Sequence, residues 1–137
     1  MNAVAKVLLF NAAGGILLLR RSATHPRFPH HLDFPGGEVE TGEQAAQAVA
    51  REIREETSLT VPATSLKLVY EKMSPDGRPY LVFTGFAPSD TSPKITLSWE
   101  HEGFEWLTAA QLLAQPLLAN VDQYYKTVLE YLKTLAS

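Results

Sequence analysis

The chain has 137 residues, of which 45% are hydrophobic and 20% are charged, a length and composition that suit one globular domain over residues 1–137. Its 15 acidic residues outnumber its 12 lysines and arginines, and the net charge of −3 argues against a broad basic surface for stable nucleic-acid binding. Cysteine is absent, which excludes disulfides, thiolate metal sites and a cysteine nucleophile.

No segment of the chain is suited to a membrane. The longest apolar runs, Val7 to Phe10 and Ile16 to Leu19, are far shorter than the roughly 20 residues that cross a bilayer. The N-terminus has no basic stretch followed by an apolar segment and a small-residue cleavage site. We therefore expect no membrane partner and a cytoplasmic location, while monomer and homodimer both stay open.

The first part of the chain predicts sheet. Val4–Phe10 and Ile16–Arg20 are largely aliphatic runs joined by Asn11–Gly15, which indicates a hairpin of two buried strands. The next segment, residues 22–37, is rich in proline and glycine, and this composition excludes a long helix or strand. We expect a loop between this hairpin and the next element.

A helix and a second hairpin are predicted next. Thr41 and Gln44 have the spacing of a capping box, so a helix is expected to start there and to run to about Thr57. Leu66–Met73 and Tyr80–Ala87 flank a Pro-Asp-Gly turn signal, which predicts a second hairpin.

The last part of the chain predicts one strand and two helices. Phe104–Leu107 is expected to form a short strand, and Thr108 with Gln111 repeats the capping pattern before a short helix that Pro116 ends. A C-terminal helix is indicated by apolar residues that share one face, namely Val121, Tyr124, Tyr125, Val128, Leu132 and Leu135.

Three glutamates of the first predicted helix point to chemistry. On a helical wheel, Glu52, Glu55 and Glu56 share an arc of roughly 100°. Like charges at these spacings destabilise a helix by roughly 0.2–0.5 kcal/mol per pair. A hard divalent cation is the simplest group that would hold them together, because Mg²⁺ takes oxygen ligands and often bridges carboxylates to substrate phosphates.

The spacing of further residues extends this pattern backwards to Gly37. Residues 37–59 closely resemble the Nudix box, G-x5-E-x7-R-E-U-x-E-E-x-G-U, where U is a bulky aliphatic residue. The matching positions are Gly37, Glu43, Arg51, Glu52, Ile53, Glu55, Glu56 and Leu59. Ser58 alone departs, standing where the family has glycine, and a left-handed cap there would cost on the order of 1 kcal/mol.

This resemblance implies a fold and an activity. The fold expected is of the α/β class, a Nudix-like α/β/α sandwich around a mixed β-sheet. The implied activity is Mg²⁺-dependent hydrolysis of a phosphoanhydride in a nucleoside diphosphate linked to another group, with Mn²⁺ as a substitute for Mg²⁺. The leading substrate is a nucleoside triphosphate, followed by a dinucleoside polyphosphate. The alternatives are a nucleotide-binding regulator without turnover, an ADP-ribose or nucleotide-sugar pyrophosphatase, and a structural domain with an acidic helix.

The resemblance also assigns roles to residues. It implies that Glu52, Glu55 and Glu56 bind the metal, with the Gly37 carbonyl as a further ligand. Glu43 and Arg51 would orient these groups. Which glutamate takes the proton from water stays open.

Other site residues lie outside the motif. Family members often recruit an acid from a loop in the second half of the chain, and Glu100 is our choice, with Glu102 as the rival. Arg20, Arg21 and Arg27 flank the proline-rich loop and are candidates for binding phosphate oxygens, because arginine suits bidentate contacts. The histidines show no metal-ligand spacing and are left out of the site.

Overall fold

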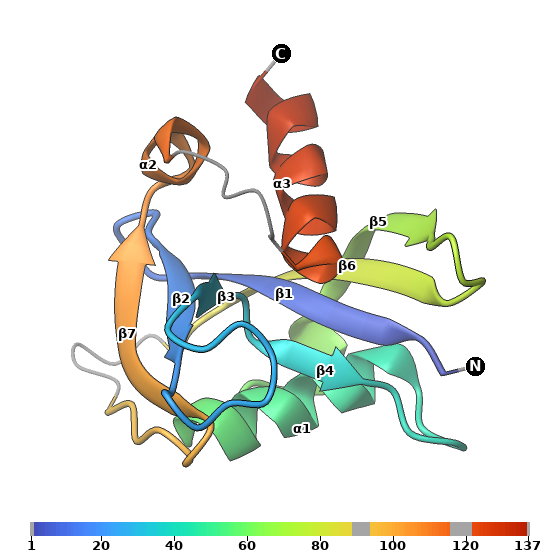
Figure 1. Ribbon diagram of the computed structural model, residues 1–137, viewed down its shortest axis with the longest axis horizontal. Helices are drawn as coiled ribbons and strands as arrows, with labels where there is room; N and C mark the ends of the chain where they lie inside the picture. The colour runs from blue at the N-terminus through green and yellow to red at the C-terminus, as the bar shows by residue number, and fades with distance from the viewer. Residues whose placement is uncertain (1, 89–93, 116–121, 137) are drawn as a thin grey trace.

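Figure 1 shows the computed structural model of the chain, which describes residues 2–88, 94–115 and 122–136. The strands are β1 (Val4–Phe10), β2 (Ile16–Arg21), β3 (Leu32–Asp33), β4 (Gly36–Glu38), β5 (Lys67–Met73), β6 (Pro79–Phe86) and β7 (His101–Leu107). The helices are α1 (Ala45–Thr57), α2 (Ala109–Ala114), α3 (Gln123–Ala136) and the single 3₁₀ turn η1 (Ala63–Ser65). Within these residues no helix combines the length and apolar character that crossing a membrane requires.

The strands form a mixed sheet in the order β3-β2-β1-β6-β5. β1 and β6 run parallel, and the other pairs are antiparallel. β4 pairs with β1, and β7 pairs with β2. β1 and β2 pair at Phe10 and Ile16 beside their turn, so the predicted first hairpin is present there, while β4 takes the other end of β1 (Figure 1).

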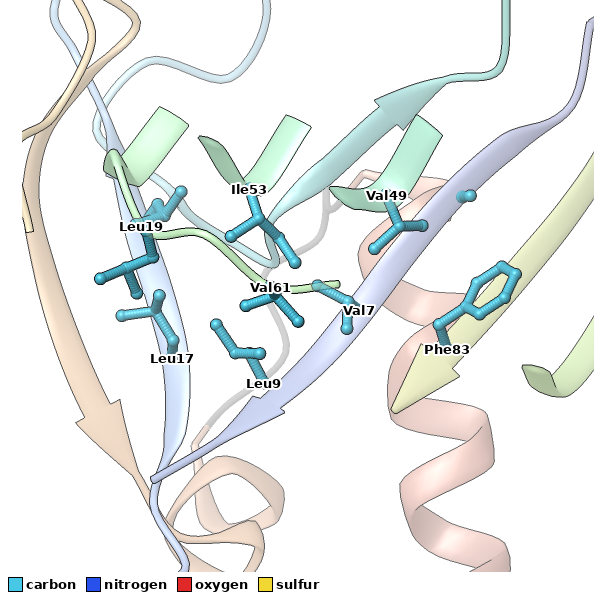
Figure 2. Close-up of a cluster of buried hydrophobic side chains, with 10 residues drawn as sticks. Val7, Leu9, Leu17, Leu19, Val49, Ile53, Val61 and Phe83 are labelled. Carbon is cyan, nitrogen blue, oxygen red and sulfur yellow. The ribbon is translucent and has the colours of Figure 1, made fainter. Parts of the chain in front are cut away.

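Helices cover both faces of this sheet, because its central strands are apolar on both sides. On one face, Val49 and Ile53 of α1 point toward Val7 and Leu9 of β1 (Figure 2). On the other face, Leu8 packs in a second buried cluster with the α3 residues Val128, Leu129 and Leu132. The predicted α/β/α sandwich around a mixed sheet is therefore the fold of this chain.

The start of α1 differs from its prediction. The N-cap is Gln44, whose backbone N–H donates to Gln47 Oε1 over 3.1 Å, so the capping box lies three residues later than the predicted Thr41–Gln44 pair. Gly42 has a φ of 84°, which turns the chain before the helix can begin. The end at Thr57 is as predicted, and Ser58 adopts the left-handed conformation with a φ of 66°.

The second half of the chain largely follows its predictions. β5 and β6 form the predicted hairpin, and Thr108 with Gln111 forms the predicted capping box of α2. β7 starts three residues before the predicted Phe104, at His101. Leu135 shares the predicted face of α3 but is 63% exposed. Pro116 and Val121 lie outside the described residues.

Candidate active site

The segment that precedes α1 is shaped by two glycines. Gly36 has a φ of 132°, and a Cβ atom there would collide with the carbonyl oxygen of Ala5, so only glycine lets β4 lie against β1. A Cβ atom on Gly37 would lie 2.9 Å from Glu52 Oε1. The backbone of Gly37 is thus in close contact with the carboxylate of Glu52.

The three glutamates of α1 differ in their surroundings. The side chain of Glu52 is 16% exposed and that of Glu55 is 57% exposed, whereas Glu56 is buried and its Oε1 accepts from Gly36 N over 2.9 Å. Burial raises the pKa of Glu52 and raises that of Glu56 well above its ordinary value, although Lys6 opposes the shift at Glu56. Both carboxylates would therefore gain from a bound cation.

Glu43 and Arg51 form a fixed pair beside these glutamates. Arg51 Nε donates to Glu43 Oε2 over 2.9 Å, and the Arg51 hydrogen bond lowers the pKa of Glu43. Arg51 also reaches Glu52 Oε1 at 3.0 Å and Glu55 Oε1 at 3.3 Å. One guanidinium therefore contacts three carboxylates of the motif, a geometry suited to orienting them.

The donor set fits a hard divalent cation. Carboxylate and carbonyl oxygens are the ligands that Mg²⁺ and Mn²⁺ prefer, and Glu52 and Glu56 lie beside the Gly36–Gly37 backbone. Across residues 2–88, 94–115 and 122–136, no three acidic or histidine side chains are already gathered in ligating positions. Arg51 instead pairs with Glu52 and Glu55, and these contacts would keep both carboxylates beside a bound cation.

A cavity of about 230 Å³ opens beside Glu56. Its lining includes Gly37 and Glu38 from β4 and Glu100 before β7. The carboxylate of Glu102 does not line the cavity and lies 3.1 Å from His30 Nδ1. The loop acid that shares this cavity with Glu56 is therefore Glu100, whereas Glu52 and Glu55 are not among the cavity residues.

The three predicted phosphate-binding arginines have different partners. Arg20 donates to the carbonyl of His30 over 2.8 Å and is not among the cavity residues. Arg21 lines the cavity but forms buried ion pairs with Asp33 and Asp122. Arg27 also lines the cavity. Of the three, Arg27 is the cavity arginine that has no ion pair among the described residues.

Several further cavity residues were not predicted as site residues from the sequence, among them Lys6, Arg78 and His101. Arg78 Nε and His101 Nδ1 are buried and have no hydrogen-bond partner within the described parts of the chain. Burial lowers the pKa of His101 to about 4, so its imidazole is neutral at neutral pH. Among these three residues, only Lys6 had a signal in the sequence that could have marked it as a site residue, because it is a lysine within an apolar strand.

Comparisons with known proteins agree with this geometry. The model of the NUDIX domain matches residues 1–131. An asymmetrical bis(5'-nucleosyl)-tetraphosphatase of Caenorhabditis elegans is 31% identical over 112 residues, which are 77% of this chain and 78% of that protein. An 8-oxo-dGTP diphosphatase of Escherichia coli is 40% identical over 70 residues, which are 50% of this chain and 54% of that protein.

A solved structure shows the same fold. The MutT protein from Methanosarcina mazei superposes with a TM-score of 0.72 at 22% identity, and the match covers 99% of this chain and 95% of that one. The chain therefore belongs to the Nudix family of hydrolases, which act on phosphorus-containing acid anhydrides. The family, the fold class and the enzyme class predicted from residues 37–59 are confirmed.

Proposed function

We propose that this chain hydrolyses a nucleoside triphosphate or, as the second choice, a dinucleoside polyphosphate, using Mg²⁺, for which Mn²⁺ can substitute. One observation carries this proposal: the buried carboxylate of Glu56 and the glycines before α1 line the same cavity. The relatives named as acting on 8-oxo-dGTP and on bis(5'-nucleosyl)-tetraphosphate support both substrate classes.

The metal would be held by oxygen atoms from three places. Glu52, Glu55 and Glu56 come from α1, the Gly37 carbonyl comes from β4, and Glu100 comes from the loop before β7. When bound, a divalent cation neutralises phosphate charge and makes water a better nucleophile. Glu43 and Arg51 would keep the carboxylates in place, and the proton of the attacking water would pass to one of the glutamates.

The cavity also offers cations to the phosphates. Arg27 and Arg78 line it from different loops, and their charge would favour a polyanion beside an acidic site. Arg21, which also lines the cavity, would assist them, and Arg20 would act from outside by holding the loop at His30. A cytoplasmic location and a monomer or homodimer complete the proposal.

A product screen tests the function. The chain would be incubated with nucleoside triphosphates, dinucleoside polyphosphates, ADP-ribose and nucleotide sugars, each with Mg²⁺ or Mn²⁺, and the products would be separated by chromatography. We expect cleavage of triphosphates or dinucleoside polyphosphates that stops when the metal is chelated. Nucleotide binding without turnover would instead favour a regulator, and cleavage of ADP-ribose alone would replace the proposed substrates.

A further inference from the structure

Lys6 is a charged residue in the middle of a buried strand. Its neighbours in β1 are aliphatic, and its own side chain is 9% exposed. A buried ammonium is unfavourable unless it is paired, and replacement of a whole buried ion pair by apolar side chains is often neutral or stabilising. Stability alone therefore gives no reason for a lysine here.

The ammonium of Lys6 connects β1 to residues 33–36, which precede α1 in the chain. Its Nζ donates to Asp33 Oδ2 over 3.1 Å and to the carbonyls of Phe34 and Gly36 over 3.3 Å each. An ammonium has three donors, so these acceptors can use all of them. Two of the acceptors are backbone oxygens, and the orientation of those peptides is therefore tied to Lys6.

The Gly36–Gly37 segment contacts two of the proposed metal ligands of α1, Glu56 and Glu52. The carbonyl of Gly36 accepts from Lys6 while its amide donates to Glu56 over 2.9 Å. The next residue, Gly37, lies against the carboxylate of Glu52. The cavity described above is lined by all four of these residues: Lys6, Gly36, Gly37 and Glu56.

We propose that Lys6 is a positioning residue, which fixes the Gly36–Gly37 backbone so that Glu56, Glu52 and the Gly37 carbonyl face one another. This inference rests on the proposed function for its consequence in metal binding. Its geometric part, the tie between Lys6 and Gly36, can be tested on the metal-free chain. Asp33 has the matching role of holding the ammonium, and Arg21 holds Asp33 from the other side at 2.8 Å.

The first test is amide hydrogen exchange on the metal-free protein. Lys6→Met keeps the length and the apolar stem but removes the three donors, and Lys67→Met makes the same change on an exposed lysine of β5. We expect exchange of the Gly36 amide to accelerate at least on the order of tenfold in Lys6→Met, with the amides of β6 unchanged. Gly36 protection within about twofold of the Lys67→Met control would overturn the proposal.

The second test is the affinity for Mn²⁺ without nucleotide, measured by electron paramagnetic resonance. Lys6→Met should bind Mn²⁺ on the order of tenfold more weakly than Lys67→Met, because the backbone that presents the ligands is no longer fixed. Equal affinities would refute the positioning role alone. Absence of Mn²⁺ binding in the wild-type chain would instead refute the proposed function.

A second variant covers the case in which Lys6→Met does not fold. Lys6→Met combined with Asp33→Asn removes both buried charges and leaves an amide for Arg21, so no unpaired carboxylate remains. This double variant should fold and should show the same faster Gly36 exchange and weaker Mn²⁺ binding. Exchange and affinity like those of the wild type would contradict the proposal.

Discussion

Glu56 is placed where its charge is unfavourable for the folded chain. Burial raises its pKa well above the ordinary value of 4.5, so the folded chain holds this proton more tightly than the unfolded chain does. The associated stability is fully present below about pH 4.5 and is lost as the pH rises through the raised pKa. Burial of Glu56 therefore destabilises the metal-free protein increasingly as the pH rises above about 4.5.

The first prediction is that Glu56→Gln melts at a higher temperature than the wild type in chelator-treated buffer. Glutamine keeps the size of the side chain and an oxygen for the Gly36 amide, but removes the buried charge. The gain should be small near about pH 5 and larger near about pH 8. Thermal scans at both pH values check this, and a gain that shrinks with rising pH would contradict the burial of the charge.

Glu100 and Glu102 are close in the sequence but differ in their relation to the cavity. Glu100 lines the cavity, while Glu102 pairs with His30 outside it. We predict that Glu100→Gln lowers kcat, though less than Glu56→Gln does, since α1 builds most of the metal site. Glu102→Gln is the matched control and should keep nearly full turnover. A crippled Glu102→Gln beside a normal Glu100→Gln would reverse the assignment.

The C-terminal end of α1 has a non-glycine residue in the left-handed conformation. Ser58 has a φ of 66°, and its Oγ donates to the carbonyl of Thr96 over 3.2 Å. Ser58→Gly removes the strain and Ser58→Ala keeps it, while both lose this hydrogen bond. We predict that Ser58→Gly is more stable than Ser58→Ala by about 1 kcal/mol in urea unfolding. Equal stabilities would show that the left-handed cap is not strained.

Some of the strands and helices could be predicted from short stretches of sequence, and others could not. The β5–β6 hairpin and the α2 cap were predictable because their turn and capping signals lie within a few residues. β3 and β4 were not, since strands of two and three residues have no periodicity of their own. β4 forms because Gly36 fits against Ala5 of β1, and β3 forms by pairing with β2, so both depend on contacts between separate segments of the chain.

The residues of the candidate site likewise include some that the sequence can group and others that only the fold brings together. The motif residues follow from spacing along one helix, so the sequence alone is enough to group Glu52, Glu55 and Glu56. Arg78 and His101 could not be grouped in this way, because the fold alone brings their separate segments to one cavity. The arginines of β2 show the converse, since spacing cannot reveal that Arg21 is already paired with Asp33.

Metal binding should raise the melting temperature of the protein. A cation that binds the folded helix and loop, and not the unfolded chain, stabilises by mass action and offsets repulsion among Glu52, Glu55 and Glu56. We predict an upward shift with Mg²⁺ that becomes smaller in Glu52→Gln. Thermal scans with and without Mg²⁺ check this, and equal shifts in both proteins would count against a shared site.

The proposed function requires that the carboxylates of α1 hold the divalent cation. The most direct measurement is kcat of Glu56→Gln against the wild type, on the best substrate of the product screen and at saturating Mg²⁺. We predict a folded variant whose kcat falls by at least on the order of 100-fold, because a ligand charge is lost without a change in size. Turnover like that of the wild type, with unaltered metal affinity, would contradict the assignment of Glu56 to the metal site.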